Sequence, residues 1–145
     1  MASGRECYPI YQGQLSHEND NLNQRTFWYV FSQSFLFGAY ASVVNAPQAA
    51  KNPLFGKQQD VLLWVIPITA ILLSGLIYPL ILISVRYMRE LSRKFEAIAG
   101  PDIDELPPIH GNPSLRRAGD LVHQALPAVL ILIWVGIIAS QIRGA

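Results

Sequence analysis

The feature that most constrains this chain is residues 61–85, VLLWVIPITAILLSGLIYPLILISV, which carry no charged side chain. As an α-helix the run is about 37 Å long, whereas the hydrocarbon core of a bilayer is about 30 Å thick. Soluble domains seldom contain so long an uncharged helix, and the run lacks the two-residue alternation of a membrane barrel strand. We therefore predict that residues 61–85 cross a membrane as a helix.

Two further uncharged runs are predicted to span the membrane. Residues 26–50 hold no charge, and the helix within them is expected to end near Asn45 because Pro47 follows. Residues 124–142 are also uncharged, and Pro113 is a good first position for the helix that contains them. The predicted fold is an all-α polytopic membrane protein with spans at about residues 26–45, 61–85 and 125–142.

The composition agrees with a small membrane protein. Of the 145 residues, 51% are hydrophobic and 14% are charged, against about 25% charged in soluble domains. The formal net charge of +1 gives no overall field that favours nucleic acid or an acidic substrate. We expect a single membrane domain over residues 1–145, in which the one cysteine, Cys7, forms no internal disulfide.

The first predicted span differs from the others because polar side chains lie in its middle. A polar side chain at that depth is better placed against protein or water than against lipid. Ser34, Gly38 and Ser42 recur every four residues and give one face that another helix can approach closely. Packing within the protein, self-association and pore lining all remain open. The candidate helix-packing or pore-lining residues are Ser32, Gln33, Ser34, Gly38 and Ser42.

The second helix is predicted to continue beyond the membrane until Gly100 and Pro101 stop it. Apolar residues from Met88 to Ile98 return at spacings of three and four, which makes one apolar and one basic face. The extension can lie against anionic headgroups or pack on a neighbouring helix, and the sequence leaves both open. The candidate membrane-surface or packing residues are Arg25, Arg86, Arg89, Arg93 and Lys94.

The positive residues predict the orientation. The connection of residues 86–123 holds six Lys or Arg, whereas the connection before the second span holds two. The positive-inside rule places residues 86–123 and the N-terminus in the cytoplasm, and the C-terminus outside. After an irregular lead-in, a helix from about Leu15 would project its first turns into the cytoplasm. We expect Asp20 to lie near Arg89 there, in a small helical layer with the start of the third helix.

No catalytic or metal-binding motif is found in the sequence. Residues of metal-ligand type cluster in 102–110, but no rigid ligand frame fixes them, so no metal is predicted. The three predicted spans hold no Asp, Glu, Lys, Arg or His, which an intramembrane enzyme or ion-coupled transporter would need. We expect neither an enzyme nor a cofactor. The ligand-type residues are Asp102, Asp104, Glu105 and His110.

Two segments resemble a group of small uncharacterised bacterial membrane proteins. SHENDNLNQRTFWYVFSQSFLFGAYASVV, residues 16–44, is similar to their opening, where an acidic, Asn-rich helix leads through an NQR element into SQ-F-LF-AY. HQALPAVLILIW, residues 123–134, is similar to their last span. The resemblance implies a bacterial inner-membrane location and a three-span layout, but no activity. The matching polar positions are Asn23, Gln24, Arg25, Ser32 and Gln33.

From these features we expect a non-enzymatic membrane protein that packs against itself or a larger membrane complex, as an accessory or assembly subunit. The expected partners are the lipid bilayer and a second copy or a larger complex, without nucleic acid. The alternative is an oligomeric pore-forming or signalling effector whose first spans present Ser32, Gln33 and Ser34 to water. A membrane-embedded enzyme is the second alternative.

Overall fold

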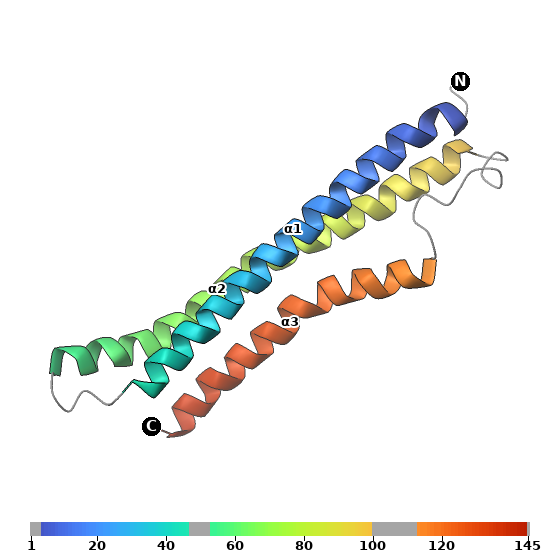
Figure 1. The fold of residues 1–145 in the computed structure, drawn as a ribbon. Coiled ribbons are helices and arrows are strands. Elements are labelled where there is room, and N and C mark those ends of the chain that lie inside the picture. Colours follow the sequence, from blue (N-terminus) through green and yellow to red (C-terminus); the bar gives the residue numbers. More distant parts are fainter. Residues whose placement is uncertain (1–3, 47–52, 100–112, 145) are drawn as a thin grey trace. The chain divides into compact units, whose positions relative to one another are not determined.

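The computed structural model describes residues 4–46, 53–99 and 113–144, and these residues form three helices (Figure 1). In chain order they are α1, Gly4–Asn45, α2, Pro53–Ala99, and α3, Pro113–Gly144. The all-α class predicted from the sequence is confirmed. Helices α2 and α3 are long and apolar enough to cross a membrane, from Gly56 to Ala99 and from Ala118 to Gly144 respectively.

The prediction of an irregular lead-in before Leu15 is wrong, because α1 already begins at Gly4 and contains Pro9. The rings of Tyr8 and Tyr11 lie against Phe95 of α2, with centroids 5.9 and 5.7 Å away. Such packing outweighs the weak local preferences from which the lead-in was predicted.

Helix α2 begins at Pro53, eight residues before the predicted span of residues 61–85. Proline suits the first helical position, since its missing N–H would have no partner there. The added turns are held by Gln59, whose Nε2 donates to the Val43 carbonyl of α1 at 2.8 Å. The predicted end of α2 before Gly100 is confirmed.

The chain divides into two compact units, which are described separately. Unit 1 comprises Met1–Thr26 with Pro79–Ala125, and unit 2 comprises Phe27–Tyr78 with Leu126–Ala145. In unit 1, α1 and α2 are antiparallel, since Tyr8 contacts Phe95 whereas Arg25 contacts Ser84. Six of the eight buried α2 positions in this unit alternate at spacings of four and three, as in a long coiled-coil contact. These six are Ile81, Val85, Met88, Ser92, Phe95 and Ala99, and the other two are Ser84 and Leu91.

The core of unit 2 brings residues of all three helices together. Ile66 and Ala70 of α2 and Trp134 of α3 are buried in one cluster. Partly buried side chains of α1 pack against this cluster, and they include Leu36, Phe37, Ala39, Tyr40 and Val43. The first predicted span therefore contributes to the same apolar core as the two helices that are long and apolar enough to cross a membrane.

Candidate functional site

Gln33 is the centre of a buried polar network in unit 2. Its side chain is on α1 and is 2% exposed. The amide Nε2 donates to the Ala70 carbonyl and to Ser74 Oγ of α2, both at 3.2 Å. The amide Oε1 accepts a hydrogen bond of 2.8 Å from Nε1 of Trp134 on α3. One side chain thus bonds to both other helices, with both amide hydrogens and the oxygen in use.

The donors and acceptors of this network have only one consistent arrangement. Ser74 Oγ donates its single hydrogen to the Ala70 carbonyl at 2.7 Å. The hydroxyl of Tyr29, 2.7 Å from Ser74 Oγ, must therefore be the donor in that contact. The Trp134 indole can only donate, which fixes the orientation of the Gln33 amide. We call Tyr29, Gln33, Ala70, Ser74 and Trp134 the polar clasp.

Aromatic packing encloses the Trp134 end of the polar clasp. Trp134 is fully buried, and its ring stacks on Phe37 of α1 at a centroid distance of 4.2 Å and an angle of 14°. Tyr40 meets the same indole edge-on at 5.8 Å. Offset stacking and edge-on contacts are the favourable arrangements of aromatic rings. Trp134 therefore combines a directional hydrogen bond with a large apolar contact.

Gln141 links the same three helices of unit 2 two turns further along α3. Its Nε2 donates to the Tyr40 hydroxyl of α1 at 2.9 Å and to the Leu63 carbonyl of α2 at 3.2 Å. Its Oε1 is buried and has no hydrogen-bond partner among the described residues. A buried acceptor without a partner costs about 1–3 kcal/mol, so this contact is weaker than the polar clasp.

Among the five candidate helix-packing or pore-lining residues of α1, Gln33 has a different environment from the other four. The hydroxyls of Ser32, Ser34 and Ser42 each donate to the carbonyl four residues back in α1, at 2.8–2.9 Å. Ser34, Gly38 and Ser42 are exposed. A Cβ added at Gly38 would meet no atom within 4 Å. Only Gln33 of this group faces the core of unit 2.

Three exposed phenylalanines share the helix face of Ser34, Gly38 and Ser42. Phe27, Phe31 and Phe35 are 63%, 58% and 71% exposed. Their spacings of three and four from the small residues put all six on one side of α1. The serine hydroxyls on this side already donate to the helix backbone, so they do not need a further polar partner. We call Phe27, Phe31, Ser34, Phe35, Gly38 and Ser42 the open α1 face.

In unit 1 the predicted cations have different environments. Arg25 Nη1 donates to the buried Ser84 Oγ at 2.7 Å. Arg89 of α2 forms an ion pair with Asp120 of α3 at 3.0 Å, whereas Asp20, which was expected beside Arg89, is exposed. The two remaining arginines of the group, Arg86 and Arg93, are exposed.

Lys94 pairs with Glu90, one turn earlier on the surface of α2, at 2.8 Å. The hydrogen bond and charge of Lys94 lower the pKa of Glu90 below its usual value. Glu90 in turn raises the pKa of Lys94 through the same hydrogen bond and charge. Both members of this ion pair belong to one helix, so the pair stabilises α2 locally.

The beginning of α3 contacts both other helices of unit 1. Asp120 binds Arg89 of α2, and His123 Nε2 lies 3.3 Å from Asn23 Oδ1 of α1. The Nδ1 of His123 lies 2.8 Å from the Gly119 carbonyl, so that nitrogen carries a hydrogen and donates. Their spacing of three residues places Asp120 and His123 on one face of α3.

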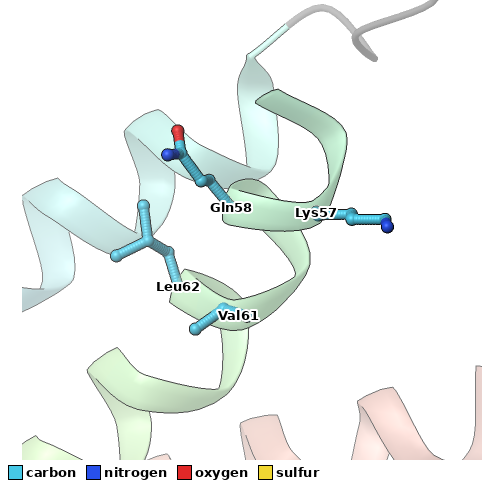
Figure 2. A pocket seen from close by; sticks show the side chains of 4 residues that line it. All are labelled: Lys57, Gln58, Val61 and Leu62. Atoms are coloured by element: carbon cyan, nitrogen blue, oxygen red, sulfur yellow. The ribbon is translucent and has the colours of Figure 1, made fainter. Parts of the chain in front are cut away.

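A shallow pocket of about 440 Å³ lies at the beginning of α2. Its described lining residues all come from this one helix, namely Lys57, Gln58, Val61 and Leu62. Figure 2 shows the Lys57 side chain pointing away from those of Gln58 and Leu62. Because no set of polar groups converges among these described residues, they give the pocket no feature of a catalytic or ligand-binding site.

No group of three His, Cys, Asp or Glu side chains that could hold a metal occurs among the described residues. The ligand-type residues Asp102, Asp104, Glu105 and His110 lie outside the described residues. Comparison of the chain with protein-family models, curated proteins and solved structures gives no match. The resemblance to small bacterial membrane proteins therefore stays a prediction.

The sequence pattern did not identify Tyr29 and Trp134 as partners of Gln33. Both residues lie within uncharged runs, Tyr29 in the first and Trp134 in the third. The hydrogen-bonding chemistry of these side chains could have indicated the pairing of Gln33 with Trp134. An indole N–H within an apolar helix needs an acceptor, and Gln33 is the mid-span side chain of the first run best able to provide one.

Proposed function

We propose that the chain is a non-enzymatic integral membrane protein with three spans, in which the polar clasp joins α1 to the two apolar helices. In unit 2, α1 contacts α3 at positions 101 residues apart on two occasions, so these helices are parallel. Gln33 contacts Ala70 and Val43 contacts Gln59, so α1 and α2 are antiparallel. Three successive spans require these directions.

Contacts within unit 1 support a common membrane boundary for the three spans. Arg25, just before the uncharged run of α1, contacts Ser84, just before the end of the run in α2. Asn23 contacts His123, just before the uncharged run of α3. The positive-inside rule makes this boundary cytoplasmic, with residues 86–123 and the N-terminus in the cytoplasm and the C-terminus in the periplasm. The resemblance adds a bacterial inner-membrane location.

The role that we propose is that of an accessory or assembly subunit, which packs against itself or a larger membrane complex. The observation that carries this proposal is the open α1 face. It offers the small residues Ser34, Gly38 and Ser42, which let a second helix approach closely, beside three exposed aromatic side chains that can pack against that helix. Its hydroxyls are satisfied internally, so association costs no hydrogen bonds.

The polar clasp disfavours the alternative of a pore lined by the first spans. Gln33 would have to turn toward water, yet its amide is fully engaged with Ala70, Ser74 and Trp134. Ser32 and Ser34 donate to the backbone of α1 and offer only weak additional polarity. The geometry is that of a side chain that holds helices together.

Cysteine crosslinking in native membranes tests the assembly role. On a Cys7→Ala background, Gly38→Cys places a thiol on the open α1 face, where a Cβ meets no atom within 4 Å. Leu72→Cys is the matched control, because Leu72 of α2 is 64% exposed in the same unit. Oxidation is expected to trap a dimer or a defined adduct through Gly38→Cys, and little through Leu72→Cys.

Two results would contradict the proposed assembly role. The first is a strictly monomeric protein in mild detergent together with no adduct at Gly38→Cys. The second is equal adduct formation at both cysteines, because random collision in the bilayer would then explain the crosslinks. Ion flux through reconstituted protein, abolished by a Gln33 substitution that leaves folding intact, would favour the pore instead.

A further inference from the structure

We propose that Arg25 and Arg86 bind the phosphate groups of anionic phospholipids where α1 and α2 enter the membrane. The inference rests on the three-span arrangement proposed above and names a lipid partner for its cytoplasmic boundary. Each arginine lies at the end of an uncharged run, before residue 26 in α1 and after residue 85 in α2. Guanidinium groups at that depth reach the headgroup layer by extending along the helix.

The Arg25 guanidinium is held in place but is not neutralised. One of its five N–H groups is donated to Ser84 Oγ at 2.7 Å, and Ser84 is 3% exposed. The buried serine fixes where the guanidinium lies on the α1–α2 contact of unit 1. In the described part of the chain, no carboxylate lies within ion-pair distance of Arg25 or Arg86. The remaining N–H groups can thus form the paired hydrogen bonds that phosphate oxygens accept.

The other cations of the extension are less suited to this role. Arg89 is paired with Asp120, and Lys94 is paired with Glu90. Arg93 is exposed, but it lies seven residues beyond Arg86, about 10 Å further along α2. The positive charge that is both unpaired and next to the apolar run is therefore concentrated in Arg25 and Arg86.

The structure also limits how α2 can meet a lipid surface. Most of the apolar face of the extension is occupied by contacts within unit 1, since Met88, Leu91 and Phe95 are only 4–6% exposed, whereas Ile98 is 46% exposed. An amphipathic helix binds along a membrane by burying such a face among the lipids. Because most of this face is covered, we expect headgroup contact mainly at the boundary arginines.

Lipid binding to the purified full-length protein tests the proposal. Phosphatidylglycerol or phosphatidylcholine would be titrated into mild detergent and the bound lipid counted by native mass spectrometry. The wild-type protein is expected to prefer phosphatidylglycerol. Arg25→Gln and Arg86→Gln should each weaken that binding about fivefold, the effect of one cation near an anionic surface. Arg93→Gln removes the same charge further away and should change it less than twofold.

Ser84→Ala separates a placed guanidinium from a general charge effect. This positioning variant should weaken phosphatidylglycerol binding in the wild-type background and have no effect when Arg25→Gln is already present. Arg25→Lys keeps the charge but loses the paired donors, so it should bind less lipid than wild type. Circular dichroism and elution volume of each variant verify that the fold is retained.

Three outcomes would overturn the proposal. They are equal binding of the two lipids, an Arg93→Gln effect as large as that of Arg25→Gln, and Arg25-dependent binding of inorganic phosphate as tight as that of the lipid. The last would assign the site to free phosphate. Failure here, with Gly38→Cys crosslinking intact, would leave the assembly role standing. Failure of crosslinking, with lipid selectivity intact, would leave this site standing.

Discussion

The two units join the same three helices with different chemistry. In unit 2 the polar clasp uses an amide, an indole and two hydroxyls, all buried and none charged. The contacts of unit 1 include charged groups, namely an ion pair between Arg89, 49% exposed, and Asp120, 12% exposed, and the hydrogen bond from Arg25 to the buried Ser84. Since a buried charge is far more costly than a buried amide, this difference is the one that the proposed three-span arrangement requires.

The difference also predicts unequal energies. When one member of a fully satisfied, buried network is removed, its partners lose their hydrogen bonds. An exposed ion pair has water as an alternative partner and contributes little. The polar clasp should therefore contribute most of the free energy of helix association, and the contacts of unit 1 should contribute less.

The largest effect is expected for Trp134→Ala. The substitution leaves a cavity beside Phe37 and strands the oxygen of Gln33, so we expect a loss of about 3 kcal/mol in the free energy of unfolding. Trp134→Phe keeps most of the ring contact and should lose about 1 kcal/mol. Unfolding in mixed micelles with increasing denaturing detergent measures both. Equal losses would mean that the cavity contributes little.

Gln33→Leu should follow, with a loss of about 1–2 kcal/mol, because Trp134 Nε1 and the Tyr29–Ser74 pair lose a partner. The control is Ser34→Ala on the adjacent position of α1. Its hydroxyl is bonded only to the backbone, so its removal should cost less than about 0.5 kcal/mol. If both variants unfold at the same detergent fraction as the wild type, the polar clasp does not hold the helices together.

Asp120→Asn should have a smaller effect, about 0.5 kcal/mol, since Arg89 is half exposed. The signature is its salt dependence. At about 1 M salt, where screening acts within about 3 Å, variant and wild type should become equally stable, whereas the Gln33→Leu effect should persist. A salt-independent loss at Asp120 would place that ion pair in a low-dielectric environment, and the contrast between the units would fail.

The smallest effect concerns the Glu90–Lys94 pair. Because the pKa of Glu90 is lowered in the folded state, its contribution is present above the unfolded pKa and is lost as the pH falls through the folded value. Because the pKa of Lys94 is raised, its contribution is present below the unfolded pKa and is lost as the pH rises through the folded one. Lys94→Gln should return the Glu90 pKa toward 4.5, as read by NMR titration. An unchanged titration would mean that the pair does not form in solution.

Much of the fold follows from simple sequence rules. The uncharged runs predicted where the helices lie, and Asn45, Gly100 and Pro113 marked ends that the structure reproduces within a residue or two. The early turns of α1 were missed because Pro9 and Gly13 speak against a helix locally. Contacts of Tyr8 and Tyr11 with Phe95, more than eighty residues away, outweigh that preference.

The candidate site was only partly predictable. Gln33 was identified because an amide within an apolar run needs a partner, but its chemistry alone does not say whether the partner is protein or water. Gln33 and Ser34 are adjacent in sequence, yet Gln33 is buried and Ser34 is exposed. Consecutive side chains of an α-helix point about 100° apart around its axis. The partners of Gln33 lie on two other helices, and their identity depends on a register that the sequence pattern does not contain.

Cysteine accessibility at Phe35 tests most directly whether the uncharged part of α1 lies in the membrane. Phe35 is 71% exposed on the protein surface, so only lipid or a partner in the membrane can protect it. On a Cys7→Ala background in sealed membranes, Phe35→Cys is predicted to resist a membrane-impermeant maleimide added to either side. Asp20→Cys, also exposed, should react from the cytoplasmic side. Labelling of Phe35→Cys as fast as Asp20→Cys would contradict the three-span account.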